Sequence, residues 1–191
     1  MEKHLFMRLP TLEELSDPMG GQDDLDVGHC ALDEAFSLAQ LLERSFGEPW
    51  DVERVQRELG PDNGVVAIYV LRAGDRLVGT ASARIVPPLY PGSGYVHWVG
   101  VDPDFRGRAL GRHVTLEVLY YFRNHGVRDA VLETDDFRLP AIRTYLGLGF
   151  VPEYRGPSDP LRWSRVMKAL SFAGAQPASN RHPTSEREVK G

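Results

Sequence analysis

Hydrophobic and polar positions along this 191-residue chain follow two periods, one typical of strands and one typical of helices. Runs with strand character lie at 4–10, at two places within 64–88, at 95–101 and at 128–135. The turn signal "AGD" separates the two runs within 64–88, which predicts an antiparallel hairpin. We also interpret 162–170, "RWSRVMKAL", as a final strand that completes the sheet.

Apolar residues at helical spacing predict four helices. The first, at 31–46, carries Ala35, Leu38, Leu41, Leu42 and Phe46. Further helices are expected at 51–59, 110–125 and 139–149, the last with Pro140 near its first turn, where proline is tolerated. The order of elements indicates one mixed α/β domain over 1–170.

Two segments have compositions that do not support a packed element. The stretch 16–30, "SDPMGGQDDLDVGHC", is rich in Gly and Asp and is expected to be a connection. The segment 171–191 is poor in large apolar residues, so burial cannot offset the entropy lost on ordering. We expect 171–191 to be a disordered tail.

The composition narrows the class of function. With 22 basic and 27 acidic residues the formal net charge is -5, which argues against nucleic acid or an anionic membrane as the main partner. No apolar run approaches the roughly 18 residues that a membrane span requires. Cys30 is the single cysteine and cannot form an internal disulfide. A cytoplasmic location is therefore expected, and a homodimer is left open.

The stretch "DFRGRALG", 104–111, joins a predicted strand to a predicted helix and has the features of an anion site. Unpaired N–H groups in the first turn of a helix point toward such a loop, and the helix dipole favours negative charge there. Two glycines allow close approach of a ligand, and three arginines add positive charge: Gly107, Gly111, Arg106, Arg108 and Arg112. A diphosphate fits this description, although neither the P-loop nor the GxGxxG signature is present.

A second segment, "LPAIRTYLGLGF" at 139–150, follows one helix and one strand later. Together the two segments resemble the signatures of the GNAT superfamily of N-acetyltransferases. The pyrophosphate signature, Arg/Gln-x-x-Gly-x-Gly/Ala, begins here at Arg106, and Ala109 replaces its central glycine. In the signature Asn-x-x-Ala-x-x-x-Tyr-x-x-x-Gly-Phe, Arg138 stands at the asparagine position, and the matching residues are Ala141, Tyr145, Gly149 and Phe150.

This resemblance implies a mixed, mostly antiparallel central sheet flanked by helices, with the fourth and fifth strands splayed apart. It also implies acetyl-coenzyme A as the cosubstrate, with its pyrophosphate at the arginine-rich loop and its pantetheine arm on the main chain of the fourth strand. The residues implied in coenzyme binding are Val99, Gly100, Val101, Arg106, Gly107, Arg108, Ala109, Leu110, Gly111 and Arg112.

The implied reaction is direct attack of a primary amine, on a small molecule or a peptide, within a ternary complex. Tyr145 stands where many family members carry a tyrosine acid, and a phenol can protonate the departing thiolate. His97 is the candidate general base, acting directly or through water. Glu133 and the pair Asp135 and Asp136 are rival bases. Purely packing roles for Tyr145 and His97 also stay open.

The alternative function is a non-catalytic acyl-coenzyme-A-binding or regulatory module of the same fold, for which the hints are Arg138 and Ala109. The histidines show no metal-ligand spacing with Cys30 or with carboxylates, so no metal is expected. The pattern does not identify the amine acceptor, and acyl groups longer than acetyl also stay open.

Overall fold

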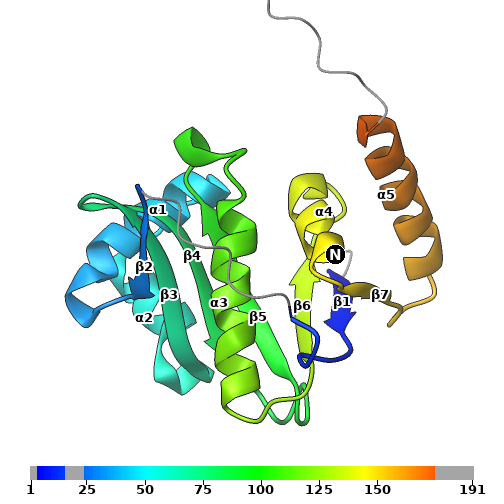
Figure 1. Ribbon diagram of the computed structural model, residues 1–191, viewed down its shortest axis with the longest axis horizontal. Coiled ribbons are helices and arrows are strands. Elements are labelled where there is room, and N and C mark those ends of the chain that lie inside the picture. Colours follow the sequence, from blue (N-terminus) through cyan, green and yellow to red (C-terminus); the bar gives the residue numbers. More distant parts are fainter. Residues whose placement is uncertain (1–3, 16–23, 175–191) are drawn as a thin grey trace, which may run out of the picture.

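The structure is a computed structural model, which describes residues 4–15 and 24–174. Seven strands form one sheet in the order β2-β3-β4-β5-β6-β1-β7 (Figure 1). All the paired neighbours are antiparallel except β5 and β6, which are parallel. The strands are β1 (Leu5–Leu9), β2 (Asp26–His29), β3 (Val65–Ala73), β4 (Arg76–Arg84), β5 (Gly94–Val101), β6 (Ala130–Thr134) and β7 (Val151–Glu153).

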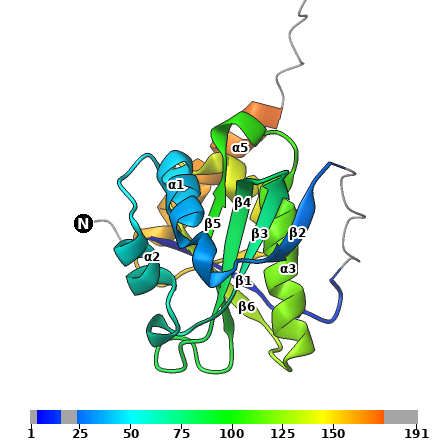
Figure 2. The ribbon, with the colours of Figure 1, turned by 90° about the vertical axis from the view of Figure 1, so that its left-hand side faces the viewer.

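Helices cover both faces of this sheet. In Figure 2, α1 (Ala35–Phe46) and α2 (Val52–Leu59) lie on one side of β3, β4 and β5, and α3 (Leu110–Asn124) lies on the other side. Two later helices, α4 (Leu139–Gly147) and α5 (Asp159–Gly174), pack against each other near β6 and β7. The mixed, mostly antiparallel sheet flanked by helices confirms the fold class expected from the sequence.

The alternation of side chains along β5 determines which groups reach each face of the sheet. Val96 belongs to the main core together with Phe122 of α3. Tyr95 lies in a separate cluster with Val131 and Tyr90, on the opposite face. Successive residues of a strand point to opposite faces, so His97, two residues after Tyr95, lies on the same face as Tyr95. The ring centroids of the two residues are 5.2 Å apart.

The parallel ladder between β5 and β6 is short. It pairs Gly94 with Ala130, Tyr95 with Val131, and Val96 with Leu132, while β5 itself continues to Val101. This early end of the pairing is consistent with the expected splay of the two strands. In the part of β5 that is not paired with β6, the pairing with β4 is interrupted by a bulge. Trp98 in this part has a φ of 47°, in the left-handed region.

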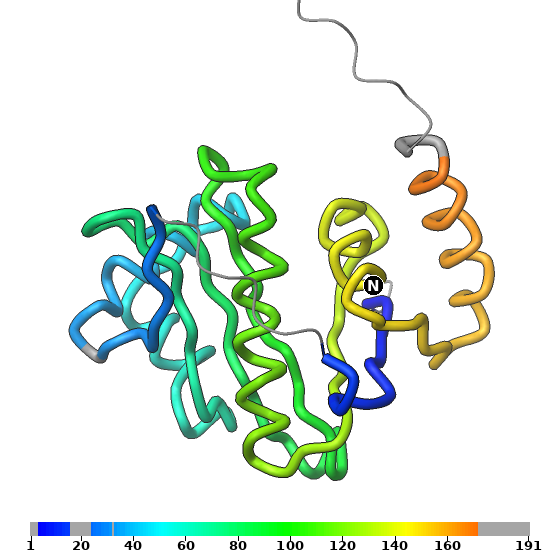
Figure 3. Tube along the Cα trace, in the orientation of Figure 1, coloured from blue at the N-terminus to red at the C-terminus, as the bar shows by residue number. Residues whose placement is uncertain are grey.

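The prediction of a final strand at 162–170 is wrong, because this stretch lies within α5. Its inward side chains, Trp163 and Val166 with partly buried Leu170, follow a helical spacing rather than an alternation. On this side of the sheet the N-terminal strand β1 lies between β6 and β7, and β7 is the edge strand. In Figure 3 the blue N-terminal segment that contains β1 lies beside the yellow segments of β6 and β7, which come much later in the sequence.

Three other elements differ from the prediction: two strands, β2 and β7, and the end of helix α5. β2 lies within the predicted connection 16–30, and β7 was not anticipated. Helix α5 continues to Gly174, so 171–174 are helical and not part of a disordered tail. The remainder of the expected tail, 175–191, and residues 16–23 of the connection lie outside the described residues. None of the helices in the described ranges is long and apolar enough to cross a membrane.

Candidate active site

A cavity of about 850 Å³ opens between β5, the loop that leads into α3, the first turns of α3 and α4, and the end of α1. It contains Tyr145 and every residue predicted to bind coenzyme except Arg108. Its walls are formed by Ser45, Phe46, Val99, Gly100, Val101, Phe105, Arg106, Gly107, Ala109, Leu110, Gly111, Arg112, Phe137, Arg138, Pro140, Ala141, Thr144 and Tyr145.

A buried carboxylate, that of Asp102, fixes the start of the loop before α3. Asp102 is fully buried and pairs with Arg44 at 2.9 Å and Arg76 at 2.8 Å, and it accepts a hydrogen bond from the N–H of Asp104 at 3.1 Å. Burial raises the pKa of Asp102, but the hydrogen bond and the two cations outweigh burial and hold the pKa below its usual value. The carboxylate therefore stays ionised and fixes the start of the loop.

The end of the loop presents backbone donors to the cavity. Gly107 has a φ of 82°, and nothing lies within 4 Å of a Cβ built there. Ala109 is the N-cap of α3, has a φ of 57°, and makes no side-chain capping hydrogen bond. The N–H groups of the first turn of α3 therefore point toward the loop that borders the cavity, without a side-chain cap from Ala109. The alanine at the usual glycine position adds more than a methyl group, since it holds a conformation that is costly for a residue with a Cβ.

Arg108 takes a different direction from its neighbours. Its guanidinium binds both carboxylate oxygens of Asp24, at 2.7 and 2.8 Å, and it is not among the residues that form the cavity. Arg106 and Arg112 do line the cavity. Two of the three predicted arginines therefore stand at the anion end of the site.

Tyr145 lies at the inner end of the cavity, where it packs on Phe150 with ring centroids 5.9 Å apart. Burial raises the pKa of its phenol to about 12, against a smaller opposing effect of Arg138. The phenol is therefore protonated throughout the working pH range. A protonated hydroxyl is the form that a proton donor to a thiolate requires.

His97 is held in a very different environment from that of a typical base. Burial, with a contribution from the positive charge of Arg84, lowers the pKa of His97 to about 3. Its Nδ1 is buried and has no hydrogen-bond partner within the described part of the chain. The imidazole is therefore neutral near pH 7 and a weak proton acceptor, which counts against a direct role as base.

The rival carboxylates differ in their partners. Asp135 binds His4 at 2.7 Å and Arg138 at 2.9 Å, and Asp136 forms an ion pair with Arg162. Glu133 instead accepts a hydrogen bond from the hydroxyl of Tyr90. Glu133 is the one of the three that is held by a neutral group and faces the side of the sheet that carries Tyr95 and His97.

Arg138, at the expected asparagine position, spans the outer part of the cavity. Its guanidinium carbon lies 5.0 Å from the ring centroid of Phe46 in α1 and 5.5 Å from that of Phe137. Its Nε donates to Asp135 at 2.9 Å. This arginine therefore brings the start of α4 close to the end of α1, which an asparagine is too short to do.

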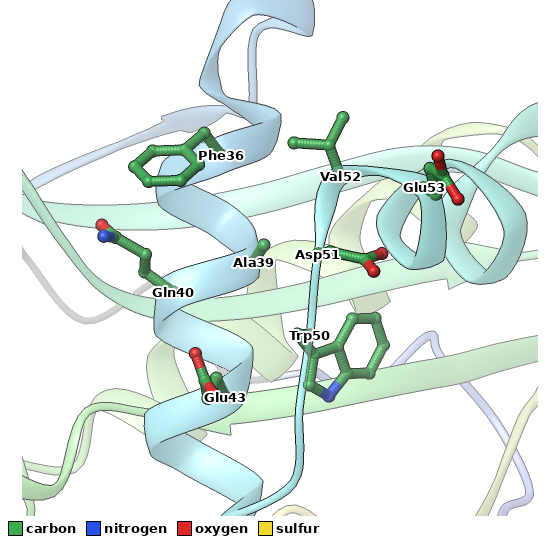
Figure 4. A pocket seen from close by; sticks show the side chains of 8 residues that line it. All are labelled: Phe36, Ala39, Gln40, Glu43, Trp50, Asp51, Val52 and Glu53. Carbon is green, nitrogen blue, oxygen red and sulfur yellow. The ribbon is translucent and has the colours of Figure 1, made fainter.

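A second hollow, of about 520 Å³, lies between α1 and the start of α2. Figure 4 shows α1, with Phe36, Gln40 and Glu43, running beside the segment that carries Trp50 and Asp51. Among the described residues it shares no wall residue with the larger cavity. The described residues also include no cluster of three or more His, Cys, Asp or Glu side chains that could hold a metal ion.

A mixed sheet with a glycine- and arginine-lined cavity at a helix start is the arrangement expected from the resemblance to acyl-coenzyme-dependent transferases. The chain belongs to the Acetyltransferase (GNAT) family, whose sequence profile it matches over residues 35–150. Members of this family use acetyl-coenzyme A as the cosubstrate. The expected family and enzyme class, an acyltransferase, are thereby confirmed.

Curated relatives match only part of this chain. It is 44% identical over 121 residues to a mycothiol acetyltransferase of Thermobifida fusca, covering 61% of this chain and 34% of the relative. It is 29% identical over 129 residues to N-acetyltransferase 8B of Rattus norvegicus, covering 60% of this chain and 57% of the relative. The chain thus spans well under two thirds of these relatives.

Solved structures share the fold. A GCN5-related N-acetyltransferase from Sphaerobacter thermophilus superposes with a TM-score of 0.61 at 21% identity, covering 80% of this chain and 50% of the other. The ribosomal-protein-S18-alanine N-acetyltransferase from Escherichia coli has a TM-score of 0.59 at 18% identity, covering 68% and 79%. At these identities the likeness concerns the fold alone.

Proposed function

We propose that this chain transfers an acetyl group from acetyl-coenzyme A to a primary amine by direct attack in a ternary complex. The observation that carries the proposal is the single cavity that connects the arginine loop to Tyr145 along Val99–Val101. The anion end and the phenol lie in one space, so a ligand with a diphosphate and a thioester can contact both.

The residues present fit this coenzyme. The uncapped start of α3 supplies N–H donors, and Arg106 and Arg112 supply charge for a diphosphate. Beyond Val96 the backbone of β5 is not paired with β6, so its main-chain groups are available to an extended amide-containing arm. A Cβ on Gly111 would lie 3.6 Å from Val101, which shows how closely the two walls approach.

We assign the proton transfers to two residues. The amine nitrogen forms a bond to the acetyl carbon while the carbon–sulfur bond breaks. The proton lost by the amine goes to Glu133, directly or through water, and the leaving thiolate takes the proton of the Tyr145 phenol. His97 stays a candidate base from the sequence, but its low pKa favours Glu133.

The acceptor is not determined by the relatives, since one is a mycothiol acetyltransferase and another is a ribosomal-protein-S18-alanine N-acetyltransferase. A screen of primary amines for coenzyme-dependent thiol release tests the proposed function. We expect release that depends on the amine and falls strongly in Tyr145→Phe. Saturable binding of acetyl-coenzyme A in calorimetry, with no release for any amine, would instead support the non-catalytic module. A cytoplasmic location and a homodimer stay predictions.

A further inference from the structure

We propose that the amine acceptor carries an anionic group, a carboxylate in the simplest case, and that Arg84 binds it. The proposal rests on the proposed acetyl transfer and narrows its acceptor to a class, amino acids and related compounds with both charges. The evidence is the placement of Arg84, Tyr95 and Glu133 on one face of the sheet.

Arg84 is a partly buried cation with neutral partners. Its Nε donates to the carbonyl oxygen of Asn63 at 2.5 Å, and its Nη2 donates to Oδ1 of the same residue. Among the described residues no carboxylate lies within ion-pair distance of it, whereas Arg8, Arg72 and Arg162 each pair with one. Charged groups that are taken out of water are normally paired. Nη1 is left to bind a partner that is not part of the described chain.

Arg84 lies on the same face of the sheet as Tyr95 and His97. Arg84 pairs with Tyr95 across β4 and β5, and its guanidinium carbon lies 5.7 Å from the centroid of the Tyr95 ring. Its positive charge also contributes to the low pKa of His97, which is two residues along the same strand. The guanidinium of Arg84 therefore lies close to the part of the sheet where β5 and β6 separate.

Glu133 stands on the other side of Tyr95. Val131, which pairs with Tyr95 in the ladder, precedes Glu133 by two residues, so both point to the same face. Tyr90 connects them, because its ring lies 5.1 Å from that of Tyr95 and its hydroxyl binds Glu133. The Tyr95 ring thus separates an unpaired cation from a carboxylate.

Such an arrangement is complementary to a molecule with an ammonium at one end and a carboxylate at the other. The amino nitrogen would lie toward Glu133, which takes the proton that the amine loses on attack, and the carboxylate toward Arg84, whose planar fork suits two oxygens. Arg155 lies on the same face, 3.9 Å above the ring of Phe6, but it is already paired with Glu153 at 2.7 Å. Arg155 therefore serves as a control, because its positive charge is already paired with the carboxylate of Glu153.

The test compares each acid with its amide. We would measure kcat/KM of the unaltered protein for glycine, β-alanine and γ-aminobutyrate and for the three corresponding amides. We expect at least one acid to be preferred about tenfold or more over its amide, in keeping with a charge-assisted hydrogen bond. In Arg84→Gln this preference should disappear, while Arg155→Gln should keep it. Equal rates for acids and amides in the unaltered protein, or the same preference in Arg84→Gln, would overturn the proposal.

Binding distinguishes this proposal from the proposed transfer. If simple amines are acetylated and the acids are not, the carboxylate site is wrong and the transferase stands. If no amine releases thiol, calorimetric titration of both proteins with γ-aminobutyrate decides the question. Saturable binding that is lost in Arg84→Gln supports the site without the chemistry, and absent or unchanged binding refutes it. Because Arg84 also holds Asn63, the melting temperature of each variant is measured alongside.

Discussion

The hydroxyl of Tyr90 donates a hydrogen bond to Oε1 of Glu133, which joins the loop before β5 to the C-terminal end of β6. This contact fixes the carboxylate without adding a positive charge to it. Glu133→Gln should keep the geometry and remove the proton acceptor, so kcat should fall by roughly 10²- to 10⁴-fold with little change in coenzyme affinity. Tyr90→Phe, which removes only the hydrogen bond, should lose much less. Steady-state rates beside calorimetry check this, and an unimpaired Glu133→Gln protein would exclude Glu133 as the base.

Removal of the Tyr145 hydroxyl tests the acid step. Tyr145→Phe keeps the ring that packs on Phe150, so the fold and coenzyme binding should change little. Turnover should fall by roughly 10²- to 10⁴-fold if the phenol protonates the thiolate. The matched variant Phe150→Leu should instead lower thermal stability. Full turnover in Tyr145→Phe would mean that the thiolate, with a pKa of about 8.5, leaves unaided.

The arginine loop contains its own control. Arg106 lines the cavity, whereas Arg108 is turned toward Asp24. Arg106→Glu places like charge beside a diphosphate and should raise the Kd for acetyl-coenzyme A by about tenfold or more. Arg108→Glu changes the net charge of the protein equally and should raise it much less. Calorimetry at two salt concentrations measures both, and equal effects would show that only the overall charge matters.

Ala109 at the start of α3 predicts a stabilising substitution. Ala109→Gly relieves a φ of 57° that costs a residue with a Cβ about 1–2 kcal/mol, although glycine also gains entropy when unfolded. We expect a net gain of about 0.5–1 kcal/mol in the free energy of unfolding. Ala109→Val should lose stability, because a branched side chain is still less suited to this region. Urea denaturation of the three proteins checks the order.

His97 should make stability depend on pH in a definite direction. Its folded pKa of about 3 lies below the usual value near 6.5, so between these values the unfolded chain binds a proton that the folded chain does not. The contribution of His97 to stability is therefore complete above pH 6.5 and is lost as the pH falls toward 3. The non-titrating variant His97→Asn should show a smaller decrease in unfolding free energy between pH 7 and pH 4.5. An identical decrease in both proteins would place the imidazole in a solvated environment.

Local patterns were sufficient for much of the fold. The hairpin of β3 and β4 follows from its turn signal, and α1 to α4 follow from helical spacing and caps. The signatures that drew attention to Arg106 and Tyr145 each depend on residues close together in the sequence, and the structure brings the two residues to one cavity.

The features that the sequence did not reveal depend on distant partners. The short run of β7 has no pattern of its own, and β2 is a four-residue edge strand. Neither the contact of Tyr90 with Glu133 nor the missing counter-charge of Arg84 could be found before the strands were placed side by side. For His97, the residue type suggested a base, and only its burial showed that the imidazole stays neutral.

The position of β1 has a consequence for the order in which the chain can fold. Leu5–Leu9 is synthesised before its partners in β6 and β7, which lie more than a hundred residues further along the sequence. Contacts of such long range close late, because the entropy of a large loop must be lost first. During synthesis the apolar side chains of β1 therefore have no neighbouring strand until β6 has been made, and β1 gains its second neighbour only when β7 follows. A nascent chain stalled before Ala130 should present this strand to chaperones, and pulse proteolysis of arrested chains of increasing length would show protection of β1 only after β6 emerges.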